Sequence, residues 1–375
     1  MSPKGLAILG SGIFAKEAHL PAIAALPSGA GELKAIYSRS EKSASDLAQA
    51  AQEILNLAQR PAIYYDGDAA TDLDALLART DIHAVIVALP ITVQPSIVRK
   101  CLAAGKHVLS EKPVAKDVAT GLELIRDVDT AYKPKGLVWR VAENWELEPG
   151  YHAAAQAIRD GKIGKVNSFN ARVVGYVAKD SKYYKTPWRT VPDYQGGFLL
   201  DGGVHTIAAL RVLLPSPMAS LSGFASQNQK HLPPHDTIHA VVRTADGVHG
   251  LVELTWGAPV PSRSEQAHGG ISVTGQDGWL NIETVALDGG RKRVVRVTVA
   301  TVTRNEKGED VGEEKHVVEE ESRGVNLELA SFLNAIDGQD DGFGTPIGAL
   351  SDVAFIQAGL NSNGQPVDLL KLVQG

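Results

Sequence analysis

Short hydrophobic runs alternate with amphipathic stretches through roughly the first 145 residues of the chain. The run Ala84-Val-Ile-Val-Ala-Leu89 has no polar side chain, which is typical of a strand buried on both faces of a parallel sheet. Expected strands cover 5–10, 33–38, 62–65, 84–89, 107–110 and 136–142, and expected helices cover 15–26, 43–59, 72–77, 95–104 and 117–130. This alternation predicts an α/β domain with a doubly wound parallel sheet and right-handed crossovers.

The pattern changes after about residue 145, where apolar and polar residues alternate within strands, as in 166–174. Further strands are expected at 237–243, 247–255, 270–274, 279–283 and 293–302, and helices at 151–160, 325–336 and 349–360. The charge-rich stretch 304–321 is expected to be a solvated hairpin or loop. We therefore predict a first domain of residues 1–145 and a second, α+β domain of residues 146–375 with a large, mostly antiparallel, open-faced sheet.

Composition narrows the function classes. The net charge of −6 argues against a nucleic-acid footprint and against a polybasic membrane surface. The single cysteine, Cys101, excludes an internal disulfide framework and a multi-cysteine metal site. No apolar stretch approaches the ~18–20 residues of a membrane span, and the start lacks the apolar run of a signal peptide. A cytoplasmic location and no membrane partner are expected.

A glycine turn, Leu9-Gly-Ser-Gly-Ile-Phe-Ala15, follows the first expected strand. Gly10 permits a tight turn, Gly12 lets backbone approach a pyrophosphate, and Ala15 allows close packing of helix on strand. The amide donors of the following helix, with Ile13 and Phe14 in the turn, complete a dinucleotide site. A purely structural glycine turn is the alternative.

The end of the second strand indicates which nicotinamide cofactor is bound. NAD enzymes usually carry an acidic residue there, whereas this chain has Ser38 and Arg39, followed by Lys42. A guanidinium can hold a 2′-phosphate in forked geometry. Hydrogen bonds to charged groups are worth about 1.5–3 kcal/mol each, so two would favour NADP by on the order of a hundredfold or more. The cofactor is therefore expected to be NADP(H); an exposed loop without a ligand is the alternative.

Other polar and loop residues follow the remaining strands and so lie at the carboxyl edge of the sheet, where ligands bind in open α/β folds. Expected cofactor contacts there are Leu89, Pro90, Gln94, Glu111, Lys112 and Asn144. For the residues after the fourth and sixth strands, loop structure is as good an interpretation as ligand contact.

Lys112 is the first candidate for chemistry, since a lysine in an apolar run is costly to bury without a partner. Asp201 and His205 are spaced four apart in Gly196-Gly-Phe-Leu-Leu-Asp-Gly-Gly-Val-His205, on a helix expected to open near Gly202. That helix end is expected to stabilise the Asp201 anion and keep the His205 imidazole neutral. A solvent-facing lysine, a structural histidine or a partial metal site are the alternatives, but no third ligand at helical spacing is found, so no metal is expected.

With these segments, the chain resembles the glucose–fructose oxidoreductase / inositol dehydrogenase / rhizopine-catabolism (Gfo/Idh/MocA) family nearly end to end. The motifs are the glycine turn, Ala104-Gly-Lys-His-Val-Leu-Ser-Glu-Lys-Pro113, the segment 196–205 and the closing segment 355–368. The residues 141–145, with Trp188 and Arg189, are similar to a fungal NADP-linked branch. The chain departs from the family at Thr92-Val-Gln94-Pro95, which lacks a histidine, and this puts the cofactor contacts there in doubt.

The resemblance implies a Rossmann domain and a substrate-binding second domain whose open sheet forms a homodimer or tetramer interface. It implies that Lys112, Asp201 and His205 are catalytic, with the nicotinamide near Lys112. Trp145, Trp188 and Arg189 are expected around substrate and cofactor; core packing is the alternative for Trp188.

The expected reaction is hydride transfer between NADP(H) and a carbonyl or hydroxyl carbon of a sugar, polyol or related small compound. His205 would serve as general acid, Lys112 would polarise the oxygen and Asp201 would orient the imidazole, although the first two roles can be exchanged. Two alternatives share the fold: a non-catalytic NADP-binding sensor, and a glycosidase-type enzyme with a retained nicotinamide cofactor.

Overall fold

The computed structural model describes residues 3–267, 269–290 and 292–374, which form two compact units. The first unit holds the chain up to Asn144 together with Val325–Leu350. The second holds Trp145–Gly324 and the chain from Ser351 onward. The single boundary expected after residue 145 therefore leaves out a return of the chain to the first unit.

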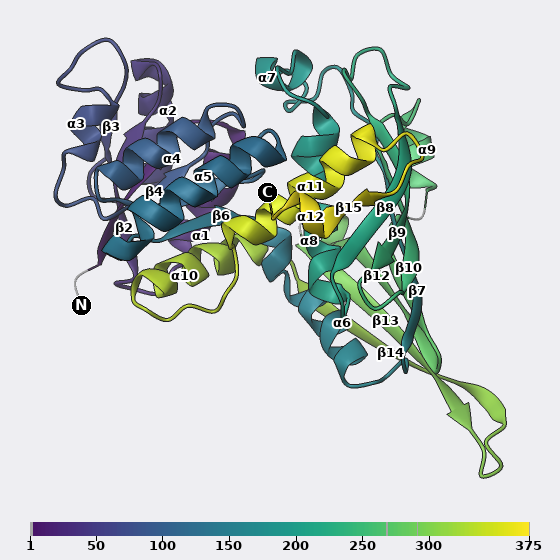
Figure 1. Ribbon diagram of the computed structural model, residues 1–375. Coiled ribbons are helices and arrows are strands. Elements are labelled where there is room, and N and C mark those ends of the chain that lie inside the picture. The colour runs from purple at the N-terminus through teal and green to yellow at the C-terminus, as the bar shows by residue number, and fades with distance from the viewer. Residues whose placement is uncertain (1–2, 268, 291, 375) are drawn as a thin grey trace. The chain divides into compact units, whose positions relative to one another are not determined.

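The first unit contains a parallel sheet of six strands in the order β3-β2-β1-β4-β5-β6. Its strands are β1 (Lys4–Leu9), β2 (Gly31–Tyr37), β3 (Ala62–Tyr64), β4 (Ala84–Val87), β5 (His107–Glu111) and β6 (Trp139–Ala142). Its helices are η1 (Ala15–His19), α1 (Leu20–Ala24), α2 (Glu41–Ile54), α3 (Leu73–Leu77), α4 (Gln94–Ala103), α5 (Val118–Ala131), η2 (Lys133–Lys135) and α10 (Gly324–Ile336). Figure 1 shows α4 and α5 side by side. The predicted doubly wound Rossmann sheet is confirmed.

The segment Val325–Leu350 belongs to the first unit because helix α10 packs into the hydrophobic core of that unit. Leu329, Phe332 and Leu333 of α10 belong to the same buried cluster as Leu6 of β1 and Ile86 of β4. All of these side chains are nearly inaccessible to solvent, and burying each large apolar side chain contributes about 1.5–3 kcal/mol. Sequence periodicity located this helix but could not show which core it completes.

The second unit contains a sheet of nine strands in the order β14-β13-β12-β11-β7-β10-β9-β8-β15. Its strands are β7 (Val166–Val174), β8 (Met218–Ser226), β9 (Thr237–Thr244), β10 (His249–Thr255), β11 (Gly270–Gly275), β12 (Gly278–Leu287), β13 (Lys292–Arg304), β14 (Asp310–Glu321) and β15 (Val367–Asp368). The β10–β7 pair is parallel and the other named pairs are antiparallel. The predicted mostly antiparallel sheet is confirmed.

Helices such as α6 (Pro149–Arg159) and α8 (Phe198–Leu213) pack against one face of this sheet, and side chains on the other face, here called the open face, are exposed among the described residues. The other helices of this part of the chain are η3 (Asn144–Leu147), α7 (Pro187–Thr190), α9 (Pro261–Glu265), η4 (Asp288–Gly290), α11 (Pro346–Asn361) and α12 (Leu369–Leu372). Strand β9 alternates buried and exposed residues, as a sheet with one solvated face requires. On the open face Phe224, Val241 and Leu251 are more than half exposed.

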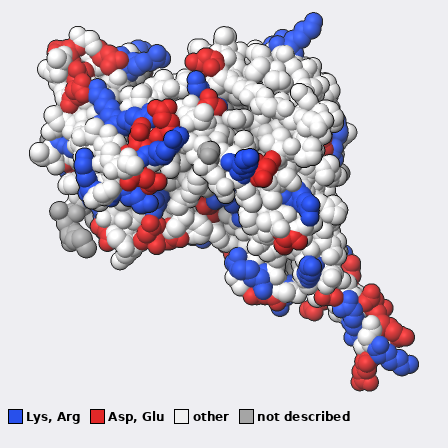
Figure 2. All heavy atoms as spheres, in the orientation of Figure 1, with Lys and Arg blue, Asp and Glu red and all other residues white. Residues whose placement is uncertain are grey.

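The stretch 304–321 forms a hairpin, one of the two expected alternatives. Strand β14 pairs with β13 along its whole length, and its side chains are almost all exposed. Figure 1 shows this hairpin reaching beyond the rest of the sheet, and Figure 2 shows acidic and basic side chains intermixed at its end. Among the described residues, no helix is long and apolar enough to cross a membrane.

Candidate active site

The glycine turn after β1 has the geometry that a dinucleotide requires. Gly10 has a φ of 110°, and a Cβ there would lie 2.2 Å from the Ala88 carbonyl oxygen, so only glycine fits. Its amide donates to the Tyr37 carbonyl over 2.8 Å, which joins the turn to β2. Apart from Gly12 itself and its two chain neighbours, no described residue has an atom within 4 Å of the position where Gly12 would carry a Cβ. The open space beside Gly12 is where a pyrophosphate can approach the backbone.

Buried polar atoms without partners mark the same edge of the sheet. Gln94 is 1% exposed, and neither its amide nitrogen nor its amide oxygen has a hydrogen-bond partner among the described residues. The hydroxyl of Ser11 in the glycine turn is likewise buried without a partner there. Leaving such groups unpaired costs about 1–3 kcal/mol each. Gln94 follows β4 and Ser11 follows β1, the two strands between which the strand order reverses, so these groups fit a bound dinucleotide.

The end of β2 presents a free cationic side chain. Arg39 is exposed and makes no hydrogen bond or ion pair within the described parts of the chain. The amide of Ser38 donates to Tyr64, and Ser40 caps the N-terminus of α2. Lys42 pairs with Asp46 over 2.6 Å on the surface of that helix. Of the three residues expected at a 2′-phosphate, Arg39 is therefore the least committed to the fold.

Lys112 directly follows β5 and is half-buried before Pro113. Its neighbour Glu111 is buried, and its Oε1 lies 2.7 Å from Nε2 of His19, which is fully buried in the helix after the glycine turn. The sequence placed Glu111 among the cofactor contacts; the structure shows that its carboxylate fastens β5 to that helix. Leu89, Pro90 and Asn144 lie half-buried beyond their strands.

Helix α8 begins at Phe198, four residues before the expected start. Gly197, with a φ of 51°, precedes it, and the two later glycines lie inside the helix where it packs closely. A Cβ on Gly202 would lie 2.5 Å from the Trp256 ring, and one on Gly203 would lie 2.8 Å from Ile356. The glycines therefore serve close packing rather than helix initiation.

Because α8 begins at Phe198, the electrostatic effect of its N-terminus differs between Asp201 and His205. Asp201 still lies in the first turn of α8, where the amide end of a helix favours an anion. His205 lies a further turn along. The helix start near Gly202, on which the expectation for His205 depended, was wrong.

Asp201 has a cationic partner that the motif did not predict. Its Oδ2 accepts from Nε of Arg189 over 2.8 Å, and both side chains are largely buried. The guanidinium of Arg189 also stacks 4.0 Å from the Trp188 ring centroid. Arg189, expected at the cofactor, is thus held between Asp201 and Trp188 within the second unit.

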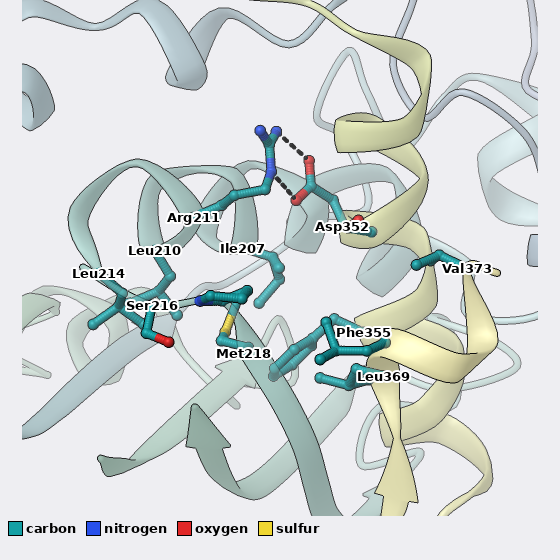
Figure 3. A pocket seen from close by; sticks show the side chains of 13 residues that line it. Ile207, Leu210, Arg211, Leu214, Ser216, Met218, Asp352, Phe355, Leu369 and Val373 are labelled. Atoms are coloured by element: carbon teal, nitrogen blue, oxygen red, sulfur yellow. Dashed lines mark hydrogen bonds and ion pairs between the residues drawn. The ribbon is translucent and has the colours of Figure 1, made fainter. Parts of the chain in front are cut away.

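Trp145 contacts the candidate catalytic histidine. Its ring stacks on the imidazole of His205 with a centroid distance of 5.4 Å and an interplanar angle of 23°. Trp145 lies in η3, and the next residue, Glu146, accepts from Nη1 of Arg211 over 2.8 Å. Arg211 also binds the buried Asp352 through two nitrogens, as Figure 3 shows. Burial alone would lower the pKa of Arg211, but the two carboxylates outweigh this and raise it.

A small cavity of about 80 Å³ lies beside this ion pair. Figure 3 shows its lining of apolar side chains from α8, β8, α11 and the C-terminal segment. Ile207 and Leu210 line it from α8, and they project from the side of that helix opposite to His205. It is much smaller than the several hundred Å³ of a typical ligand pocket, so we assign it no part in the reaction.

Sequence reasoning missed His19 in the first unit, and Glu146, Tyr194, Arg211 and Asp352 in the second. None of them is part of a recognisable sequence motif. His19, Glu146, Arg211 and Asp352 bind partners far away in the sequence, and the burial of Tyr194 depends on the packing of other segments. Among the described residues, no group of three or more His, Cys, Asp or Glu side chains could hold a metal ion.

The fold and the edge of the parallel sheet define a dinucleotide-binding protein of the Rossmann class. Residues 4–136 match the family described as "Oxidoreductase family, NAD-binding Rossmann fold", and residues 151–281 match the "GFO/IDH/MocA C-terminal domain". The chain belongs to the GFO/IDH/MocA oxidoreductase family, as its motifs predicted.

Individual relatives agree with this membership. The dehydrogenase FPY6 of Fusarium mangiferae is 39% identical over 96% of both chains. A dTDP-3,4-didehydro-2,6-dideoxy-alpha-D-glucose 3-reductase of Streptomyces violaceoruber is 30% identical over 78% of this chain and 76% of its own. The crystal structure of an oxidoreductase from Thermotoga maritima, 27% identical, matches 99% of both chains with a TM-score of 0.80.

Proposed function

We propose that the protein is an NADP(H)-dependent oxidoreductase acting on a carbonyl or hydroxyl carbon of a sugar, polyol or related small compound. The observation that carries the proposal is the match to both family domains. The family resemblance implies that Lys112, Asp201 and His205 are the catalytic residues. The sugar-nucleotide reductase among the relatives supports the choice of a sugar-like substrate.

The nicotinamide ring supplies or accepts the hydride when the cofactor is bound. In the direction of reduction, we assign to His205, in its imidazolium form, the donation of a proton to the substrate oxygen, which leaves a neutral imidazole. The Lys112 ammonium polarises that oxygen and stabilises the charge that develops on it. Asp201, with its charge balanced by Arg189, orients the donor; Trp145 holds the His205 ring by stacking.

Arg39 is the basis for NADP over NAD in this proposal. We expect Arg39→Glu to lower the ratio of NADPH to NADH efficiency by about a hundredfold, because a carboxylate repels the 2′-phosphate that the guanidinium attracts. The measurement is kcat/KM with each cofactor at saturating substrate. Arg126→Glu, the same charge change at an exposed position of α5, serves as the control and should leave the ratio unchanged. An unchanged ratio in Arg39→Glu would refute the NADP assignment.

The open face of the second unit's sheet fits the oligomer that the family resemblance implies. Phe224, Val241 and Leu251 lie on neighbouring strands β8, β9 and β10, and all three are exposed. Exposed apolar side chains on adjacent strands are typical of an interface. We propose a homodimer or tetramer through this face, acting in the cytoplasm.

A further inference from the structure

Tyr194 is a buried residue that the proposed mechanism does not use. It lies in the segment between β7 and α8, three residues before Gly197, and is 7% exposed. Its hydroxyl oxygen is buried and has no hydrogen-bond partner among the described residues. Its ring lies 6.5 Å from that of Trp188, whose other neighbour is the Arg189 guanidinium.

A series of contacts connects the phenol to the candidate catalytic carboxylate: Tyr194 lies against Trp188, Trp188 stacks on Arg189, and Arg189 binds Asp201. Burial raises the pKa of Tyr194, and the negative charge of Asp201 raises it further, while Arg189 acts in the opposite direction. The hydroxyl therefore keeps its proton throughout the physiological range and can act as a hydrogen-bond donor at every working pH.

An unpaired buried hydroxyl is unusual in a folded protein, since most buried polar groups find a partner. Tyr37 shows the ordinary case in this chain, because its hydroxyl donates to Asp66 over 2.7 Å. Tyr194 has no such partner in the described chain, so its hydrogen bond is available to a molecule from outside. A sugar substrate presents hydroxyl and carbonyl oxygens of the kind that a phenol donor recognises.

We propose that Tyr194 is a substrate-binding residue whose hydroxyl donates to one hydroxyl or carbonyl oxygen of the substrate held at Asp201 and His205. This inference rests on the proposed function. It makes Tyr194 a determinant of specificity, because a site that hydrogen-bonds a substrate hydroxyl discriminates strongly against an analogue that lacks it.

The test is Tyr194→Phe in the full-length protein. Wild type is first assayed with NADPH and NADH, and with the oxidised cofactors, against a panel of aldoses, ketoses, dicarbonyls and polyols, and the best substrate is kept. We expect Tyr194→Phe to lower kcat/KM for that substrate by about 10- to 100-fold. The Tm of the free protein should stay unchanged or rise, because no hydrogen bond to another described residue is lost. Tyr37→Phe is the stability control, and its Tm should fall because the Asp66 contact is removed.

Monodeoxy analogues of that substrate give a readout that a structural role would not move. With wild type, kcat/KM for one deoxy analogue should be lower than for the parent substrate by about the same factor. With Tyr194→Phe, kcat/KM for that analogue and for the parent substrate should be equal. A lower Tm in Tyr194→Phe, similar to that in Tyr37→Phe, overturns the inference because the hydroxyl then has a partner in the fold. Unchanged kcat/KM also overturns it, since a water would then satisfy the group. If wild type turns over no panel compound, the proposed function fails, and this inference fails with it.

Discussion

At the scale of single residues, the candidate site depends on contacts that fix the orientation of its polar groups. The stack of Trp145 on His205 restricts the imidazole to one plane, and the Arg189 pair restricts Asp201. Aromatic contacts of this kind are worth about 0.5–1.5 kcal/mol, enough to select one ring orientation. Trp145 was expected from the sequence to line the substrate pocket, whereas its contact in the structure favours a positioning role.

Replacing Trp145 distinguishes these two roles. We expect Trp145→Leu to lower kcat by about 10- to 100-fold with little change in KM, because a proton donor that loses its orientation reacts more slowly. Trp145→Phe keeps an aromatic face and should retain most of the activity. Steady-state kinetics on the best panel substrate measure both parameters. A raised KM with normal kcat would instead assign Trp145 to substrate binding.

The sequence could predict those residues whose role follows from local spacing, and not those whose environment depends on distant segments of the chain. Asp201 and His205 were predictable because their spacing of four is local and places them on one helix face. Gln94 was predictable as an edge residue because it follows a buried strand, and the structure adds that its amide is unpaired. Tyr194 was not predictable, because the isolation of its hydroxyl depends on how a long segment packs.

At the scale of elements, helix α8 carries three polar residues of the second unit: Asp201, His205 and Arg211. Its internal glycines bring it close to Trp256 and to Ile356 of α11, and Arg211 at its far end binds Glu146 and Asp352. The strands with clear alternation were predicted from the sequence, and the glycine-rich start of α8 was not, because glycine in a sequence indicates a turn unless its packing is known. Strand β8 was missed since small polar residues, Ser220 and Ser222, weaken its pattern.

The ion network on α8 should dominate the stability of this region. We expect Arg211→Leu to lower the free energy of unfolding by about 3–5 kcal/mol, because two buried carboxylates lose their cation. Lys133→Ala, which removes an exposed pair with Asp129, should cost about 0.5 kcal/mol or less. Urea unfolding followed by circular dichroism measures both. Similar losses in the two variants would contradict a structural role for the Arg211 network.

At the scale of the whole molecule, the candidate residues are divided between the two units. The first carries the glycine turn, Gln94, Arg39 and Lys112, and the second carries Asp201 with His205. Periodicity predicted both kinds of sheet. The assignment of α10 to the first unit could not be predicted, since it depends on the fit of Leu329 and Phe332 to a distant core.

The most direct test of the account is NADPH binding and turnover of the substrate panel by wild type and Lys112→Ala. We predict that Lys112→Ala binds NADPH and lowers kcat by about 10²–10⁴-fold, because the group that polarises the substrate oxygen is lost. Lys116→Ala, at an exposed position of the same segment, is the matched control and should keep wild-type kcat. Near-normal kcat in Lys112→Ala would contradict the mechanism, and NADPH binding without turnover by wild type would contradict the assignment as an enzyme.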